Sequence, residues 1–287
     1  MTDWGALADN LSAAAVASLA VLLAAFVFGA ARDRHRVVDV AWGLAFTAIA
    51  LVTFAMSAGH GDPLRRWLVM AMTVAWGLRL AVHLLVRNWG HPEDRRYAAM
   101  LGTARGSRNW YAFRKVYLLQ AAIAWFVSLP VQLAQYDPSP PGALFFTGLA
   151  LWAVGLAFES VGDAQLRAFR RDRANRGLVL DTGLWRYTRH PNYFGDACVW
   201  WGLYLTACGT WPGAATVLSA ALMTYFLAAK TGKPLMESHL AATRPAYAAY
   251  TRRTSGFLPR PRATEKPRLP QEAGAFAAVS GSARRSR

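Results

Sequence analysis

The stretch Leu11–Ala31, LSAAAVASLAVLLAAFVFGAA, contains no charged residue. At a rise of 1.5 Å per residue, an α-helix of this length matches a hydrocarbon core of roughly 30 Å. Further long stretches with almost no charge follow along the chain: Val37–Ala58, Trp67–Val86, Val116–Gln135, Ala143–Gly162, Tyr193–Cys208 and Gly213–Ala229. The sequence therefore predicts an all-α integral membrane bundle of about seven transmembrane helices.

The composition excludes several other classes of protein. The chain has 287 residues, of which 54% are hydrophobic and 17% charged. Soluble domains carry about 25% charged residues, and disordered chains are poor in aromatic and apolar residues. Cys198 and Cys208 stand in apolar surroundings, which excludes a disulfide scaffold and a cysteine-built metal site. The six histidines are scattered, with no carboxylate at metal-ligand spacing around a pair, so no metal site is expected.

The positive charge, +16 overall, predicts a topology. Segments 32–36, 88–114, 163–191 and 230–287 hold 27 lysines and arginines, whereas the alternate segments 59–66, 136–142 and 209–212 hold two. Basic residues gather on the cytoplasmic side of membrane proteins. We therefore expect a multi-pass protein of the cell (inner) membrane, with the N-terminus outside and the C-terminus in the cytoplasm. Because membrane topology accounts for the charge, no nucleic-acid partner is expected.

The chain is predicted to form a single integral membrane domain over residues 1–260, followed by a basic, disordered cytoplasmic tail over 261–287. The first ten residues contain Asp3 and Asp9 and no basic residue, which favours a retained first helix over a cleaved signal peptide. The glycine-rich patterns of Rossmann and P-loop nucleotide sites are absent.

Polar residues gather at the edges of the fifth and sixth predicted spans. Glu159, Asp163 and Arg167 are spaced four apart and so share one face of a helix. More arginines follow, then Asn192 and Asp196. Guanidinium groups bind phosphates, and acidic or amide groups bind hydroxyls, so this set suits a nucleotide-like cofactor. The alternative interpretation is an interfacial loop whose arginines meet anionic lipid headgroups.

Several blocks of the sequence resemble a known family. Residues 183–196 read GLWRYTRHPNYFGD and precede Trp200-Trp201-Gly202, while Trp76-Gly77-x-Arg79 and Glu159-x-x-x-Asp163 lie upstream. Together with blocks at Asp39, at 93–97, at 231–237 and at 244–259, they resemble the steroid 5-alpha-reductase family over roughly residues 37–260. The resemblance looks closest to a bacterial branch described only as a domain of unknown function.

The resemblance implies a membrane reductase that takes hydride from NADPH in a cytoplasm-facing cavity and delivers it to an activated C=C bond of a steroid-like or other lipid. Such an enzyme draws its lipid substrate from the bilayer, and no obligate protein partner is evident. An acidic residue paired with a tyrosine polarises the substrate carbonyl, for which Asp39 and Tyr97 are the candidates, with Tyr111 and Tyr117 left open. Carried over by motif, the expected NADPH contacts are Arg79, Glu159, Asp163, Arg167, Tyr187, Asn192 and Asp196.

Two departures from the family concern the cofactor contacts. Asp196 stands where the animal enzymes have a glutamate, so the carboxylate is one methylene shorter. A histidine-rich segment of those enzymes is replaced here by Lys230–Glu237.

Two functions of other classes remain open. Integral isoprenylcysteine and phospholipid methyltransferases carry a similar Arg-His-Pro-x-Tyr-x-Gly block, which Arg189–Gly195 satisfies, followed by a glutamate such as Glu237. That hypothesis places S-adenosylmethionine in the loop. A transport or scaffold role is the third hypothesis, although the pseudo-symmetric halves typical of transporters are not evident.

Overall fold

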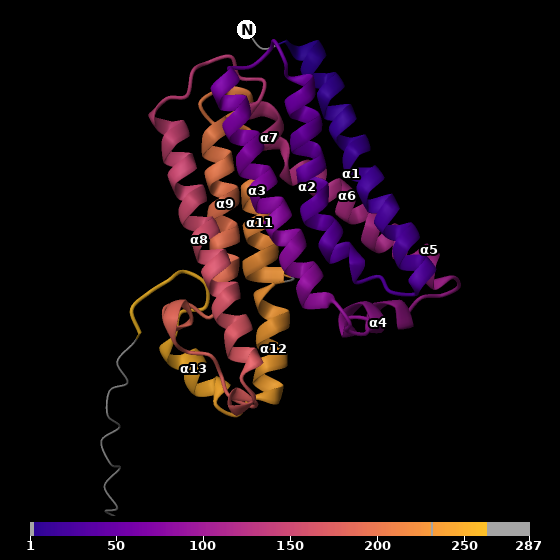
Figure 1. The fold of residues 1–287 in the computed structure, drawn as a ribbon, viewed down its shortest axis with the longest axis vertical. Helices are drawn as coiled ribbons and strands as arrows, with labels where there is room; N and C mark the ends of the chain where they lie inside the picture. The colour runs from indigo at the N-terminus through magenta and orange to yellow at the C-terminus, as the bar shows by residue number, and fades with distance from the viewer. Residues whose placement is uncertain (1–2, 231, 263–287) are drawn as a thin grey trace, which may run out of the picture.

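The computed structural model describes residues 3–230 and 232–262. Long helices run antiparallel between two ends of a bundle (Figure 1). One end carries the start of α1 and the loops 57–62, 135–142 and 208–210, and we call it the acidic-loop end after Asp62 and Asp137. The other, which we call the basic end, carries 33–36, 89–107, 172–190 and α13 (Figure 1).

The described part of the chain is helical, with a single isolated bridge between Thr188 and Ser255. Its α-helices are α1 Trp4–Arg32, α2 Val37–Met56, α3 Pro63–Asn88, α4 Arg95–Gly102, α5 Arg108–Ala112, α6 Leu119–Val127, α7 Leu129–Ala134, α8 Ala143–Arg171, α9 Pro191–Ala207, α10 Trp211–Ala214, α11 Val217–Tyr225, α12 Lys233–Thr243 and α13 Tyr247–Arg253. A π-helical turn, η1 Phe113–Leu118, joins α5 to α6, and a second one, η4 Phe226–Lys230, follows α11. Two short 3-10 turns are η2 Arg173–Asn175 and η3 Gly183–Arg186.

The all-α membrane bundle predicted from the sequence is confirmed, and the described residues contain five candidate spans by length and hydropathy. α1, α2, α3, α8 and the segment Trp211–Thr243 are long and apolar enough to cross a membrane. The predicted fourth span is divided among η1, α6 and α7, and the predicted sixth corresponds to the 17-residue α9. The count of seven therefore stays a prediction.

The helices begin where local chemistry favours it. The Asp62 side chain accepts a hydrogen bond from the Arg65 backbone N–H at 2.9 Å, and Pro63 occupies the first helical position of α3. α3 thus starts four residues before the predicted apolar span. The C-terminal end of α1 is closed by Asp33, which adopts a left-handed conformation with φ 49°.

Glycines allow α8 and α9 to pack backbone against backbone. A Cβ at Gly195 would lie 2.5 Å from the Gly155 carbonyl oxygen and 2.6 Å from the Glu159 nitrogen. One heptad further, a Cβ at Gly202 would lie 2.6 Å from the Gly148 oxygen. Small residues bring helices together in membranes in this way. The close approach sets the α9 side chains beside Glu159.

The exposed and buried side chains of α1 match those of a helix that faces lipid. Val16 is 66% exposed and Val27 59% exposed, whereas Asn10 and Ser18 of the same helix are fully buried. Apolar side chains on the outside and polar ones within are typical of a helix that faces hydrocarbon. The chain is a multi-pass membrane protein. The tail predicted over 261–287 lies, from residue 263 on, outside the described residues.

Candidate functional site

The centre of the site is Arg79 of α3, held between two carboxylates of α8. Its Nη1 donates to Glu159 Oε1 and its Nη2 to Asp163 Oδ2. The side chains of both acids are almost completely buried, and that of Arg79 is 20% exposed. The i, i+4 spacing of the acids predicts one helix face, and the structure presents this face to α3.

Two further side chains complete the hydrogen bonds of this pair. Trp76, three residues before Arg79, donates from its indole nitrogen to Glu159 Oε2 at 2.9 Å. Asn192, in the first turn of α9, donates to Asp163 Oδ1 at 3.1 Å. Both carboxylates therefore have each oxygen occupied, and three helices meet at one polar centre.

Asp196 brings a third carboxylate to the same centre. It lies one turn after Asn192 on α9, is 9% exposed, and interacts electrostatically with Glu159, Arg79 and Asp163. The Trp200 side chain also interacts with the Asp196 carboxyl group. Three carboxyl groups from α8 and α9 therefore converge on one guanidinium, and buried acidic groups of this kind are costly to keep inside a bundle.

A polar stripe on α3 leads from this centre toward the basic end. His83 lies one turn after Arg79, with its Nε2 3.6 Å from Asp163 Oδ2. Arg87, one turn further, lies 4.0 Å from Asp39 Oδ2. The Tyr97 hydroxyl donates to Asp39 Oδ1 at 2.7 Å. The structure therefore brings together the two residues predicted to be catalytic, beside the stripe that begins at Arg79.

The remaining predicted cofactor residues lie at the rim. Arg167 continues the α8 face one turn beyond Asp163 and is exposed. Tyr187, in the loop before α9, is 46% exposed. The structure thus gathers Arg79, Glu159, Asp163, Asn192 and Asp196 into one cluster and leaves these two at the solvent edge of the basic end. Their predicted roles remain predictions.

A second cluster of polar side chains holds the loop before α9 in place. Arg189 donates from Nε to Glu237 Oε1 at 2.9 Å and from Nη1 to the Thr254 carbonyl at 2.7 Å. His190 Nε2 lies 3.1 Å from the same Glu237 oxygen, and its ring stacks on Tyr193 at 5.2 Å. Burial lowers the pKa of His190 below its usual 6.5, and the Glu237 carboxylate opposes this shift in part.

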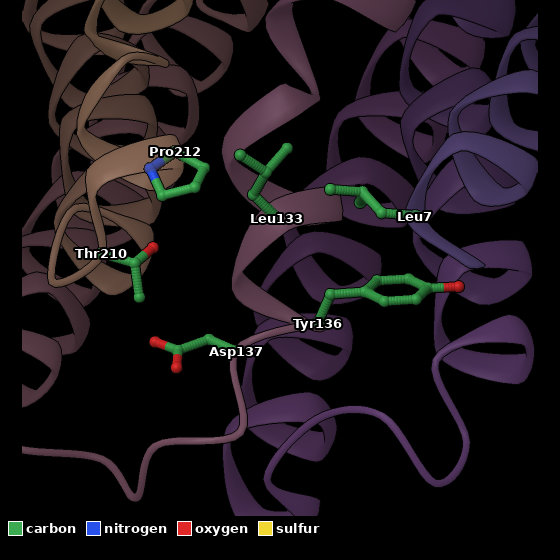
Figure 2. Close-up of a pocket in the computed structure, with 6 residues that line it drawn as sticks. All are labelled: Leu7, Leu133, Tyr136, Asp137, Thr210 and Pro212. Carbon is green, nitrogen blue, oxygen red and sulfur yellow. The ribbon is translucent and has the colours of Figure 1, made fainter. Parts of the chain in front are cut away.

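A small pocket lies at the acidic-loop end of the bundle, away from these clusters. Figure 2 shows Leu7, Leu133 and Pro212 above Asp137, with the Tyr136 ring extending beside Leu7. Asp137 pairs with Arg65 at 3.3 Å. The pocket contains none of the predicted cofactor residues, and the cytoplasm-facing cofactor cavity stays a prediction. Within the described residues no group of three or more His, Cys, Asp and Glu side chains is arranged for a metal ion.

Sequence reasoning missed two members of the central cluster. Trp76 was noticed only as part of a motif, although its spacing of three from Arg79 places both on one helix face. His83 is not among the predicted site residues, because its distance to Asp163 depends on how α3 is rotated against α8. No signal in the sequence reports that rotation.

The chain belongs to a family whose model matches most of its length. Residues 25–254 match the family model described as "Protein of unknown function (DUF1295)". The match covers α2 to α13 and includes both clusters of the site. Comparison with curated proteins and with solved structures found no match.

Proposed function

We propose that the protein is a membrane-embedded reductase that uses NADPH to reduce an activated C=C bond of a steroid-like or other lipid. The observation that carries the proposal is the convergence of three buried carboxyl groups on Arg79, with Asn192 beside them. The resemblance of these positions to the steroid 5-alpha-reductase family supplies the reaction class.

The donor set fits a dinucleotide. Carboxylate and amide groups bind ribose hydroxyls and a carboxamide, and Glu159, Asp163, Asn192 and Asp196 supply these groups between the helices. Arginines bind phosphates, and they follow on the exposed end of α8, from Arg167 to Arg171. A cofactor that enters with its phosphates at the membrane surface and its ring inward matches this order of charges.

The chain's own residues have separate tasks in this proposal. The bound cofactor supplies the hydride. Asp39 and Tyr97 share a hydrogen bond near the basic end, and a hydroxyl held in this way stabilises the charge that develops on a substrate carbonyl. Arg79 holds the two α8 acids in position, and the surrounding helices exclude water from them.

The proposed setting is the cell (inner) membrane, with the basic end and the C-terminus in the cytoplasm. The distribution of lysine and arginine between the two ends supports this orientation. NADPH then reaches the centre from the cytoplasm and the lipid from the bilayer.

The test measures cofactor binding to the detergent-purified protein. Thermal unfolding is recorded with NADPH, NADH and S-adenosylmethionine in parallel. A ligand at 100 times its Kd stabilises by about 2.7 kcal/mol. We expect NADPH to raise Tm in the wild type and to lose this effect in Asn192→Ala. Asn175→Ala is the matched control, because Asn175 lies at the same end but bonds to the Phe169 carbonyl.

A methyltransferase is the second candidate, because the contact of Arg189 and His190 with Glu237 assembles three residues of that motif. A Tm shift with S-adenosylmethionine alone would replace the reductase by this candidate. An NADPH shift that Asn192→Ala leaves unchanged would place the cofactor elsewhere and refute the site.

A further inference from the structure

Two cationic groups converge at the basic end, outside the central cluster. A Cβ built on Gly256 would lie 2.7 Å from Lys233 Nζ and 3.1 Å from Arg189 Nη2. The two cationic nitrogens therefore both lie close to one point next to the Gly256 backbone. Like charges at this separation repel, and they are stable together when an anion lies between them or beside them.

The available carboxylate does not balance both cations. Glu237 accepts hydrogen bonds at one oxygen from Arg189 and from His190. Lys233 makes no ion pair within 4.0 Å in the part of the chain that the structure describes. Lys233 is also the first residue of α12, where the helix dipole disfavours a cation and favours an anion.

Two buried hydroxyl groups lie close to the same arginine. Tyr247 and Thr254 are 3% and 4% exposed, and Thr254 Oγ1 has no hydrogen-bond partner among the residues that the structure describes. The Tyr247 hydroxyl interacts with the Arg189 side chain, and Thr254 receives its hydrogen bond at the backbone carbonyl. Burial, with the Glu237 carboxylate adding to it, raises the pKa of Tyr247 to about 12, so this hydroxyl stays a donor.

We propose that Lys233, Arg189, Tyr247 and Thr254 form a binding site for a phosphate group at the Gly256 turn. Two cationic donors and two hydroxyls match the oxygens of a phosphate, which binds most strongly through charge-assisted hydrogen bonds. Glycine at 256 lets both cations approach the backbone where a side chain would otherwise lie. The site goes beyond the reductase proposal, because a phosphate on a cofactor, on a lipid headgroup or free in solution satisfies it equally.

The decisive measurement is thermal unfolding of the full-length detergent-purified protein against inorganic phosphate, with chloride at equal ionic strength. We expect phosphate to raise Tm in the wild type. Lys233→Gln should weaken the apparent phosphate affinity about tenfold and slightly raise Tm without phosphate, because it removes the repulsion. Lys230→Gln, a nearby exposed lysine, is the matched control and should behave as the wild type.

Gly256→Ala supplies a second variant, because its methyl group displaces Lys233 without changing any charge. It should lose the phosphate response as Lys233→Gln does. A phosphate response of equal size in the wild type and in both variants overturns the proposal, and so does a wild type that does not respond.

Two further arms identify the source of the phosphate. A loss of affinity in Lys233→Gln for NADPH but not for NADH assigns the site to the cofactor. A loss of binding to phosphatidylglycerol vesicles, with phosphatidylcholine as control, assigns it to a headgroup. A phosphate response without any cofactor response leaves this site intact while it refutes the reductase.

Discussion

The bundle contains one arginine at the acidic-loop end and another toward the basic end, and the two have different surroundings. At the acidic-loop end, the buried Arg65 faces one carboxylate, Asp137, at 3.3 Å and donates to the carbonyls of Ser139 and Thr206. Toward the basic end, Arg79 is partly exposed and faces the carboxyl groups of Glu159, Asp163 and Asp196.

The difference separates a structural pair from a binding centre. The Arg65 guanidinium is only 6% exposed on its side chain, is balanced one to one, and lies 5.0 Å from the centre of the Phe145 ring. The Arg65 guanidinium therefore needs no additional charged partner. Around Arg79 three carboxyl groups face one guanidinium, and the arginine side chain is 20% exposed. Arrangements that cost stability are typical of sites that bind something.

The largest expected effect comes from breaking the balanced pair. Arg65→Met leaves Asp137 buried without its cation and the carbonyls of Ser139 and Thr206 without their donor. We expect the free energy of unfolding to fall by about 3–5 kcal/mol. Chemical unfolding in detergent measures it, and NADPH affinity should not change. A loss below 1 kcal/mol would show that water replaces the guanidinium at this end.

The next effect tests the close contact that holds the central cluster. Gly195→Ala places a methyl group 2.5 Å from the Gly155 oxygen and 2.6 Å from the Glu159 nitrogen. Overpacking of this kind costs about 1–3 kcal/mol. Because the shift moves α9 relative to Glu159, NADPH affinity should fall with stability.

Gly209→Ala is its control, since nothing lies within 4 Å of the added methyl group. If Gly195→Ala and Gly209→Ala unfold alike, α8 and α9 separate easily and the glycines do not position the site.

Helix faces could be predicted from the sequence, and contacts between helices could not. The spacing of Glu159 and Asp163 predicts their shared face, which the structure confirms. The pairing of both with Arg79 depends on the rotation and depth of α3 against α8, which hydropathy does not report. Arg189 and Glu237 are 48 positions apart and meet only because α12 docks on the loop before α9.

Boundaries differ for a related reason. An apolar window ends near the membrane surface, but a helix continues through interfacial turns. α8 accordingly runs on to Arg171, nine residues past the predicted span that ended at Gly162. These extra turns carry Asp163 and Arg167, whereas Glu159 lies within the predicted span.

A smaller effect sharpens the contrast between the two arginines. Asp163→Asn removes one of three acids around Arg79, so Glu159 still pairs with the guanidinium. We expect unfolding free energy to change by less than about 1 kcal/mol and NADPH affinity to fall about tenfold. Asp137→Asn, at the balanced pair, should lower the free energy of unfolding and leave NADPH affinity unchanged. Isothermal titration measures NADPH affinity and chemical unfolding measures stability in both variants. Equal losses of stability would show that the surroundings of Arg65 and Arg79 do not differ in this way.

The smallest effect is a pH dependence at the second cluster, where Glu237, Arg189 and Lys233 surround His190. The pKa of His190 is lowered in the folded protein, so its contribution to stability is present above about pH 6.5 and is lost as the pH falls through the folded value. One such proton changes stability by at most about 1.4 kcal/mol per pH unit. His190→Gln should therefore flatten the decline of Tm between pH 7 and 5, whereas His239→Gln, an exposed histidine on α12, should not. Parallel declines in all three proteins would mean that acid weakens the bundle elsewhere, and the loop before α9 would then be fastened by Arg189 alone.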